Sequence, residues 1–210
     1  MSESLLTKNV VETVDDLEAI YGAAAPASLR KVADRMTPEY RKWIASSSFC
    51  VLATVGPEGA DASPRGDRGE VVFELDDKTL AMPDWRGNNR TDSLRNIVRD
   101  GRVALMFLTP GSGTVIRING RGAVSVDPEL IARFEAGGKA PKTVVLFEIE
   151  ELYFQCAKSV LRSGLWDQER WPDLSVLPTM GDILASMTDG EVGGAKYDME
   201  WPDRAQKTLW

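Results

Sequence analysis

The chain has 210 residues, 43% hydrophobic and 27% charged, which is enough for one sizeable core and a small appendage. Lys and Arg total 25 against 32 for Asp and Glu, and the net charge of −7 argues against general binding to nucleic acid or anionic membrane. The absence of histidine excludes Ser-His-Asp and Cys-His nucleophile pairs and every His-ligated metal site.

The first 48 residues show the apolar spacing and capping residues of short helices. Thr37 before a proline and an acid is typical of a helix start. We expect residues 1–36 to form an amino-terminal helical segment ahead of the main domain. The predicted helices cover residues 14–21, 26–36 and 38–46.

From residue 49 the apolar pattern becomes that of β-strands separated by polar or glycine-containing turns. We expect the first four strands to form an antiparallel meander. Six or seven strands, mostly linked by hairpins, predict a mainly β domain over residues 37–166, folded as a closed or partly split β-barrel with flanking helices. The predicted strands cover residues 49–55, 60–64, 70–75, 79–82, 103–109, 114–126 and 143–155, and the interposed helices 92–99 and 127–135.

Residues 167–210 form a third part, an acidic carboxy-terminal arm with nine acids and four bases. A helix is expected over residues 178–187. Apolar side chains at Trp171, Leu174 and Leu177 indicate an arm that packs on the barrel or on a partner subunit, rather than a disordered tail.

The amino terminus carries acids from its third residue and has no apolar stretch of the kind found in signal peptides. No apolar run approaches the roughly 20 residues of a membrane span. Cys50 and Cys156 stand alone, which is typical of buried thiols in a reducing compartment. We therefore expect a cytoplasmic protein that does not associate with membranes.

The segment from Asp84 to Leu94 joins a strand to the start of a helix, where free backbone N–H groups favour an anion. Its two arginines, two asparagines and two hydroxyls add donors suited to phosphate. The alternative is a helix capped by Thr91 or Asp92 with solvated arginines. The pattern alone leaves both interpretations open.

Two further clusters carry polar groups beside strands. In residues 62–69, Gly66 and Gly69 follow Arg65 and flank Asp67 and Arg68. The glycines allow the backbone to approach a ligand closely, although a charged hairpin loop has the same pattern. Residues 156–166 place Lys158 and Arg162 on one helical face, which an exposed basic turn would also do. Cys156 has no histidine to activate it.

Four separated stretches, ASPRGD, MPDWRGNNRTDSLRNI, IRINGRG and FQCAKSVLRSGLWD, resemble the FMN-binding flavoproteins related to pyridoxamine 5′-phosphate oxidase. The resemblance extends over roughly residues 35–166. More narrowly, the chain resembles the branch with a C-x-K-x-x-x-R-S-x-L-W signature near its carboxy terminus. It implies a split β-barrel homodimer that binds FMN between the subunits and acts on a small-molecule substrate.

The resemblance also implies which residues bind the cofactor. Arg65 matches a phosphate-binding arginine on the second strand, and the strand-to-helix segment matches the part that holds the phosphate and the ring. Arg117 and Asn119 match a strand that faces the flavin of the partner subunit. The implied cofactor-binding residues are Arg65, Gly66, Asp67, Met82, Pro83, Asp84, Arg86, Asn88, Asn89, Arg90, Ser93, Leu94, Arg117, Asn119, Lys158, Ser159 and Arg162.

The chain departs from the vitamin-oxidising members in two places. Their Arg-x-Val-Leu-Leu-Lys strand is replaced at residues 65–69, and their carboxy-terminal Arg-Leu-His-Asp-Arg stretch has no counterpart. Vitamin B6 oxidation is therefore not expected. The leading hypothesis is an FMN-dependent oxidoreductase that transfers hydride from a nicotinamide or other small donor. The alternatives are a flavin-binding or sensing protein without turnover, or a relative that uses a deazaflavin or haem.

Overall fold

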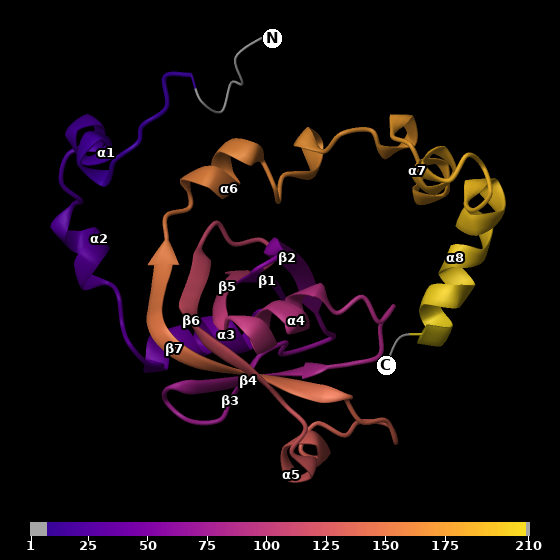
Figure 1. The fold of residues 1–210 in the computed structure, drawn as a ribbon, viewed down its shortest axis with the longest axis horizontal. Coiled ribbons are helices and arrows are strands. Elements are labelled where there is room, and N and C mark those ends of the chain that lie inside the picture. Colours follow the sequence, from indigo (N-terminus) through magenta and orange to yellow (C-terminus); the bar gives the residue numbers. More distant parts are fainter. Residues whose placement is uncertain (1–7, 209–210) are drawn as a thin grey trace. The chain divides into compact units, whose positions relative to one another are not determined.

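The computed structural model describes residues 8–208, in two compact units of which one ends at Val32 and the other begins at Ala33. The first unit contains helix α1 (Val14–Tyr21) and helix α2 (Pro26–Arg30) (Figure 1). The helix predicted over residues 26–36 is therefore too long. Ala33 instead exchanges two backbone hydrogen bonds with Leu152, which requires an extended chain at this point.

The second unit is built on a seven-stranded antiparallel sheet in the order β2-β1-β5-β6-β7-β4-β3 (Figure 1). With its flanking helices this is the predicted mainly β, split-barrel fold. The strands are β1 (Phe49–Gly56), β2 (Gly59–Gly66), β3 (Phe73–Glu74), β4 (Thr79–Asp84), β5 (Arg102–Leu108), β6 (Val115–Ser125) and β7 (Thr143–Gln155). The helices are α3 (Pro38–Ala45), α4 (Asp92–Arg99), α5 (Pro128–Ala132), α6 (Lys158–Ser163), α7 (Met180–Met187) and α8 (Gly194–Thr208).

The predicted meander of the first four strands is wrong. β1 and β2 form one hairpin, β3 and β4 form another, and the two hairpins lie at opposite ends of the sheet order. Between them the chain places Val71 and Val72 in the core, which keeps these residues out of a strand ladder and shortens the predicted strand 70–75 to two residues. β4 pairs with β7 along its whole length, a contact between distant parts of the sequence.

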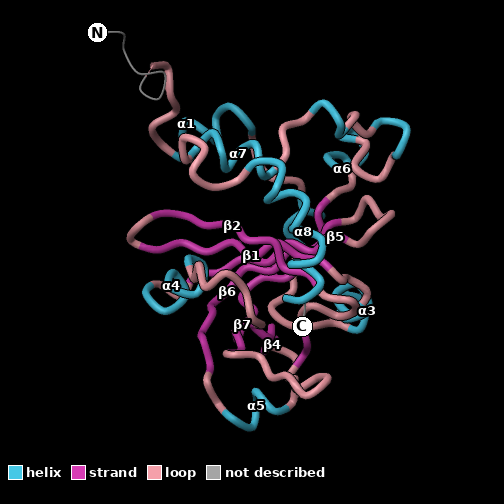
Figure 2. The backbone as a smooth tube through the Cα atoms, turned by 90° about the vertical axis from the view of Figure 1, so that its right-hand side faces the viewer, coloured by secondary structure: helices cyan, strands magenta, loops and turns pink. Residues whose placement is uncertain are grey.

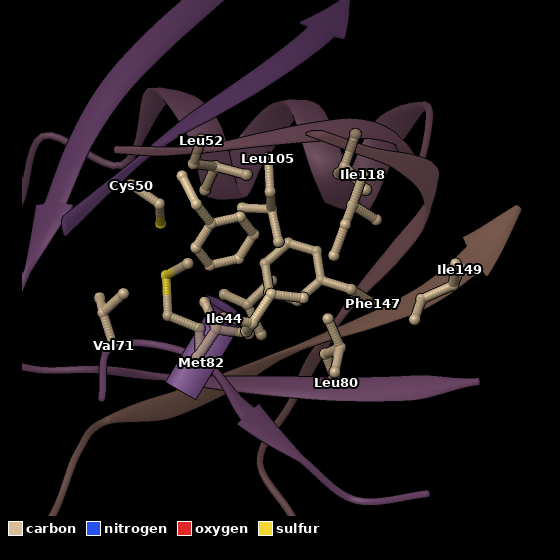
Figure 3. Packing of buried hydrophobic residues seen from close by; sticks show 14 of the residues in the cluster. Ile44, Cys50, Leu52, Val71, Leu80, Met82, Leu105, Ile118, Phe147 and Ile149 are labelled. Carbon is tan, nitrogen blue, oxygen red and sulfur yellow. The ribbon is translucent and has the colours of Figure 1, made fainter. Parts of the chain in front are cut away.

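Alternate residues of the long strands point into one apolar core. Leu52 and Leu105 come from neighbouring strands, Phe147 comes from β7, and Ile44 of α3 packs against them (Figure 3). All four side chains are almost fully buried. Burial of this kind contributes roughly 1.5–3 kcal/mol per large apolar side chain. The core therefore fixes the register of the strands and the positions of the residues at their ends.

The other face of the sheet carries partly exposed side chains in rows that cross the strands. This outer face is apolar over β1 and β5 and polar over β6 and β7. One row contains Pro64, Val51, Met106, Arg117 and Tyr153, and the next contains Ala62, Ala53, Ala104, Asn119 and Glu151. The register therefore turns Arg117 and Asn119 away from the barrel interior.

Helix α4 packs beside β1 and β2 (Figure 2). The Asn96 amide donates to Thr54 Oγ1 at 3.2 Å and to the Gly59 carbonyl at 3.4 Å, and so ties the helix to this hairpin. The helix begins at its predicted residue, Asp92.

The carboxy-terminal arm is more helical than predicted. The expected helix 178–187 is present as α7, and α8, which was not predicted, follows it and packs against it. Across residues 8–208, the helices are all too short or too polar to cross a membrane.

Candidate functional site

A cavity of about 380 Å³ lies beside β2, the end of β4 and the loop that leads into α4. It gathers residues from two of the three polar clusters in the sequence and places them around one space. The implied cofactor-binding residues that line it are Arg65, Gly66, Asp67, Met82, Pro83, Asp84, Arg86, Asn88, Asn89, Arg90 and Leu94.

Two partly buried charges stand at the inner wall of this cavity. Arg65 Nη1 of β2 donates to Asp84 Oδ1 at the end of β4 at 2.9 Å, and these side chains are only 23% and 19% exposed. Arg65 Nε and Thr143 Oγ1 are buried and, within residues 8–208, neither has a hydrogen-bond partner. Because an unpaired buried polar group is costly, these two donors mark a place where a ligand would be stabilised.

The loop over residues 85–91 forms the rim of the cavity. Asn89 has a φ of 59°, in the left-handed region that asparagine tolerates better than most residues. Lys142 Nζ donates to Asn89 Oδ1 at 2.9 Å, and the Lys142 backbone N–H donates to the Asp84 carbonyl at 3.0 Å. Lys142 therefore holds the rim loop against the start of β7.

The amino-terminal end of α4 opens at the same cavity. Thr91, its N-cap residue, lines the cavity and makes no side-chain capping bond, which leaves the first backbone N–H groups available to an anion. Ser93, one of the implied site residues, lies outside the lining. Its buried hydroxyl donates to Asp61 of β2 and helps to hold α4 on the hairpin.

The remaining implied site residues lie on other surfaces. On the outer face, Arg117 donates to Gln155 Oε1 at 3.3 Å and stacks over the Tyr153 ring at 5.2 Å, and Asn119 donates to Glu151 Oε2 at 2.8 Å. Lys158, Ser159 and Arg162 are exposed on α6. Within one chain, six of the implied cofactor-binding residues therefore lie outside the cavity lining: Ser93, Arg117, Asn119, Lys158, Ser159 and Arg162.

The cavity has a cationic rim. The Asp92 carboxylate, hydrogen-bonded to Arg90 at 2.5 Å, raises the pKa of that arginine. Arg86 and Lys142 have no acidic partner among residues 8–208. An anionic ligand would therefore meet two positive charges that no carboxylate of the described chain neutralises.

The cysteine nearest to the cavity is not suited to act as a nucleophile. Burial raises the pKa of the Cys50 thiol to about 12, although the charge of Arg65, its cross-strand neighbour, opposes this rise. The thiol therefore stays protonated at neutral pH. Among residues 8–208, no group of three or more acidic or cysteine side chains is placed to hold a metal ion.

The sequence analysis did not identify Lys142 or Thr143 as site residues. Lys142 precedes β7 and Thr143 is its first residue, and nothing in the local sequence marks them as functional. They reach the cavity because β7 pairs with β4, which places Thr143 opposite Asp84. Predicting Lys142 and Thr143 as site residues would have required knowledge of the β4–β7 pairing.

The sheet order and this cavity define the class of protein, a split β-barrel with an arginine-lined cavity beside the helix that follows β4. A protein-family model described as pyridoxamine 5′-phosphate oxidase matches residues 36–156, more than half of the chain. The chain belongs to this family.

The solved structures that match part of the chain have low sequence identity to it. HupZ of Group A Streptococcus is 18% identical, with a TM-score of 0.48 over 58% of this chain and 94% of that one. A candidate pyridoxamine 5′-phosphate oxidase from Lactobacillus delbrueckii is 24% identical, with a TM-score of 0.47 over 58% and 95%. An FMN-binding protein from Syntrophomonas wolfei is 15% identical, with a TM-score of 0.42 over 67% and 95%. The comparison with curated proteins finds no match.

Proposed function

We propose that the protein binds FMN in this cavity and is an FMN-dependent oxidoreductase. The observation that carries the proposal is the pair of buried donors without partners, Arg65 Nε and Thr143 Oγ1, inside a cavity with a cationic rim. A phosphate group provides acceptors for both donors and charge for the rim. Membership of the pyridoxamine 5′-phosphate oxidase family supports the same cofactor class.

The chain's own residues would divide the work of binding. Arg65 and the free N–H groups at the start of α4 would hold the phosphate, with Arg86 and Arg90 adding positive charge from the rim. Pro83 and Asp84, at the end of β4, would present their backbone to the ring. The bound flavin would supply hydride transfer at its N5 atom, and the protein would supply orientation and charge.

We propose that the functional unit is a homodimer in which each site lies between two subunits. Arg117 and Asn119 point away from their own cavity, on a sheet face whose apolar half is uncovered in one chain. A second copy packed on this face would cover the apolar rows and bring these two side chains to the partner's cavity. The cavity volume of about 380 Å³ is near the lower end for small-molecule sites, as expected for a site that a second chain completes.

The substrate is proposed to be a small molecule other than a B6 vitamer, because the vitamin-binding stretch of the related oxidases has no counterpart in this chain. Cys50 and Cys156 are free thiols. This supports a reducing compartment, and we propose the cytoplasm.

Purification without added cofactor, followed by a visible spectrum and FMN titration, tests the binding proposal. A yellow protein, or one that takes up one FMN per chain, supports it, and a colourless protein that fails to bind FMN overturns it. A preference for a deazaflavin in a parallel titration would reject FMN as the cofactor. Anaerobic mixing with NADH, NADPH or other small donors tests turnover: bleaching of the flavin followed by reoxidation supports an oxidoreductase, and no reduction by any donor supports a binding protein.

A further inference from the structure

We propose that the carboxy-terminal arm, residues 167–208, is exchanged between subunits and packs on the barrel of a second copy of this chain. The inference rests on the proposed homodimer and adds the element that holds it together. Three observations support it. The start of the arm is hydrogen-bonded to its own barrel, its two helices pack against each other, and many of its apolar side chains are exposed.

The start of the arm is fixed to its own barrel. Trp166 Nε1 donates to the Ser112 carbonyl in the β5–β6 turn at 2.7 Å, and Trp171 Nε1 donates to the Leu165 carbonyl at 3.1 Å. Arg170 donates to the Arg162 carbonyl at 2.8 Å and so closes the end of α6. These contacts set the direction in which the arm leaves the barrel.

Beyond this attachment the arm folds on itself. Thr179 caps α7 in a reciprocal capping box with Asp182. Asp198 of α8 accepts from Thr179 Oγ1 at 2.6 Å and from the Gly181 backbone N–H at 2.9 Å. A Cβ at Gly181 would lie 2.4 Å from Asp198 Oδ2, so the glycine permits the close approach of the two helices. The two helices of the arm therefore have a defined arrangement relative to each other.

The apolar side chains of this surface are uncovered. Leu174 is 72% exposed and Met180 is 66% exposed, and other large apolar residues of the arm are similar. Scattered exposed apolar residues are ordinary, but so many on one segment mark an interaction site. These residues are Trp171, Leu174, Val176, Leu177, Met180, Ile183, Met187, Val192, Met199 and Trp201.

The chain's own barrel does not cover them. Within residues 8–208, no hydrogen bond or ion pair joins residues 172–208 to the barrel, and α7 and α8 pack against each other. Figure 1 shows the arm, from orange to yellow, leaving α6 and running outside the barrel to α8.

A second copy of the chain matches this surface in polarity and charge. Its outer sheet face offers Val51, Met106 and their neighbours, which are also partly exposed. The arm is acidic, whereas Arg86 on the cavity rim and Lys142 beside it lack acidic partners among residues 8–208. In a symmetric dimer each contact is made twice, so each arm would cover the part of the partner's outer face that the partner barrels leave exposed. An interface of standard size takes about 20–30 residues from each partner, fewer than the arm and the sheet face supply together.

Site-specific photocrosslinking of the full chain tests the exchange. Benzoylphenylalanine replaces Leu177 or Met180 and, as the control, Val98, an apolar residue on α4 that is at least as exposed as these two. Irradiation of the two arm variants is expected to give covalent dimers on a denaturing gel, with the linked peptides mapping to the barrel. A monomeric protein, links confined to one chain, or links only between two arms would each overturn the proposal.

Charge substitutions give a second test. The double variant Leu177→Asp and Met180→Asp is expected to raise the dimer dissociation constant at least tenfold in sedimentation equilibrium, with an unchanged circular dichroism spectrum, while Val98→Asp leaves it unchanged. An unaltered dissociation constant in the double variant overturns the exchange. FMN titration of the unmodified chain is read separately: crosslinked dimers that bind no FMN reject the proposed function alone, and FMN-binding chains without arm crosslinks reject the exchange alone.

Discussion

The cavity beside β4 and the outer face of β6 carry the two halves of the proposed flavin site, and they differ in how their polar groups are satisfied. In the cavity, Arg65 Nε and Thr143 Oγ1 are buried without partners. On the outer face, Arg117 and Asn119 already bond to Gln155 and Glu151. Unsatisfied buried donors gain more from a ligand than satisfied surface groups do. We therefore expect the cavity to set cofactor affinity and the outer face to add to it.

The largest effect is expected from Arg65→Ala. Each charge-assisted hydrogen bond contributes about 1.5–3 kcal/mol, so the FMN dissociation constant should rise about 10- to 100-fold. Titration calorimetry measures this change. Arg68→Ala is the matched control, because Arg68 is exposed just beyond the end of β2 and does not line the cavity. Equal affinities for the two variants would remove Arg65 from the site.

The next largest effect tests the geometry of the outer face. β6 and β7 shift register between Asn119 and Gly120, and a Cβ at Gly120 would lie 1.9 Å from the Glu148 carbonyl oxygen. Gly120→Ala should lower the free energy of unfolding by about 1–3 kcal/mol, measured by urea denaturation. Gly69→Ala, with no atom within 4 Å of the added Cβ, should leave it nearly unchanged. A Gly120→Ala variant as stable as the parent would show that the strands adjust easily here.

Arg117→Ala should weaken FMN binding about tenfold, as expected for the loss of one such bond in a partly exposed position. Its combination with Arg65→Ala sharpens the comparison. In a mixed dimer of the two single variants, one site carries both changes and the other carries neither. Co-expressed, differently tagged chains should therefore regain one tight FMN site per dimer. If the mixed dimer does not regain a tight FMN site, then Arg65 of one subunit and Arg117 of the other do not contribute to the same site.

A smaller effect is expected for Lys142→Met. This lysine holds Asn89 in the rim loop and adds charge near the ligand, but its contact is exposed. FMN affinity should fall several-fold, and the loss should shrink as salt is raised, because salt screens exposed charges. Lys42→Met, on the exposed side of α3, serves as the control. A salt-independent loss would indicate a structural role alone.

The smallest effect concerns the two thiols. Because burial raises the pKa of Cys50 to about 12, this thiol should not react with a disulfide reagent at pH 8, whereas the exposed Cys156 should. One equivalent is expected from the folded chain and two in denaturant. In the unfolded chain the Cys50 thiol ionises near its ordinary pKa of 9.0, whereas in the folded chain it stays protonated to higher pH. Its contribution therefore lowers the free energy of unfolding only as the pH rises above about 9. Two equivalents from the folded chain would show that the β1 core opens.

Local sequence patterns were sufficient to predict most of the strands and the helix that begins at Asp92, because alternation and capping act between near neighbours. Arg86 and Arg90 were proposed from the density of donors in one local segment and from the family resemblance, and the structure places both beside the cavity. The β4–β7 pairing was not predicted, since it joins residues far apart in the chain, and Lys142 and Thr143 were missed with it. Helix α8 was missed because its pattern is interrupted by Pro202 and by polar residues.

One side of the cavity is formed by strands β4 and β7 and the other by the loop over residues 85–91, and the two sides differ in how readily they accept substitutions. Asp84 and Thr143 are paired in a sheet that the whole core supports, so substitutions there carry a cost to folding. The rim over residues 85–91 depends on few contacts, among them the bond between Lys142 and Asn89. Loops of this kind accept insertions and replacements readily. Substitutions in the rim are therefore expected to alter which molecules enter the cavity at less cost to folding than substitutions in the wall formed by Asp84 and Thr143.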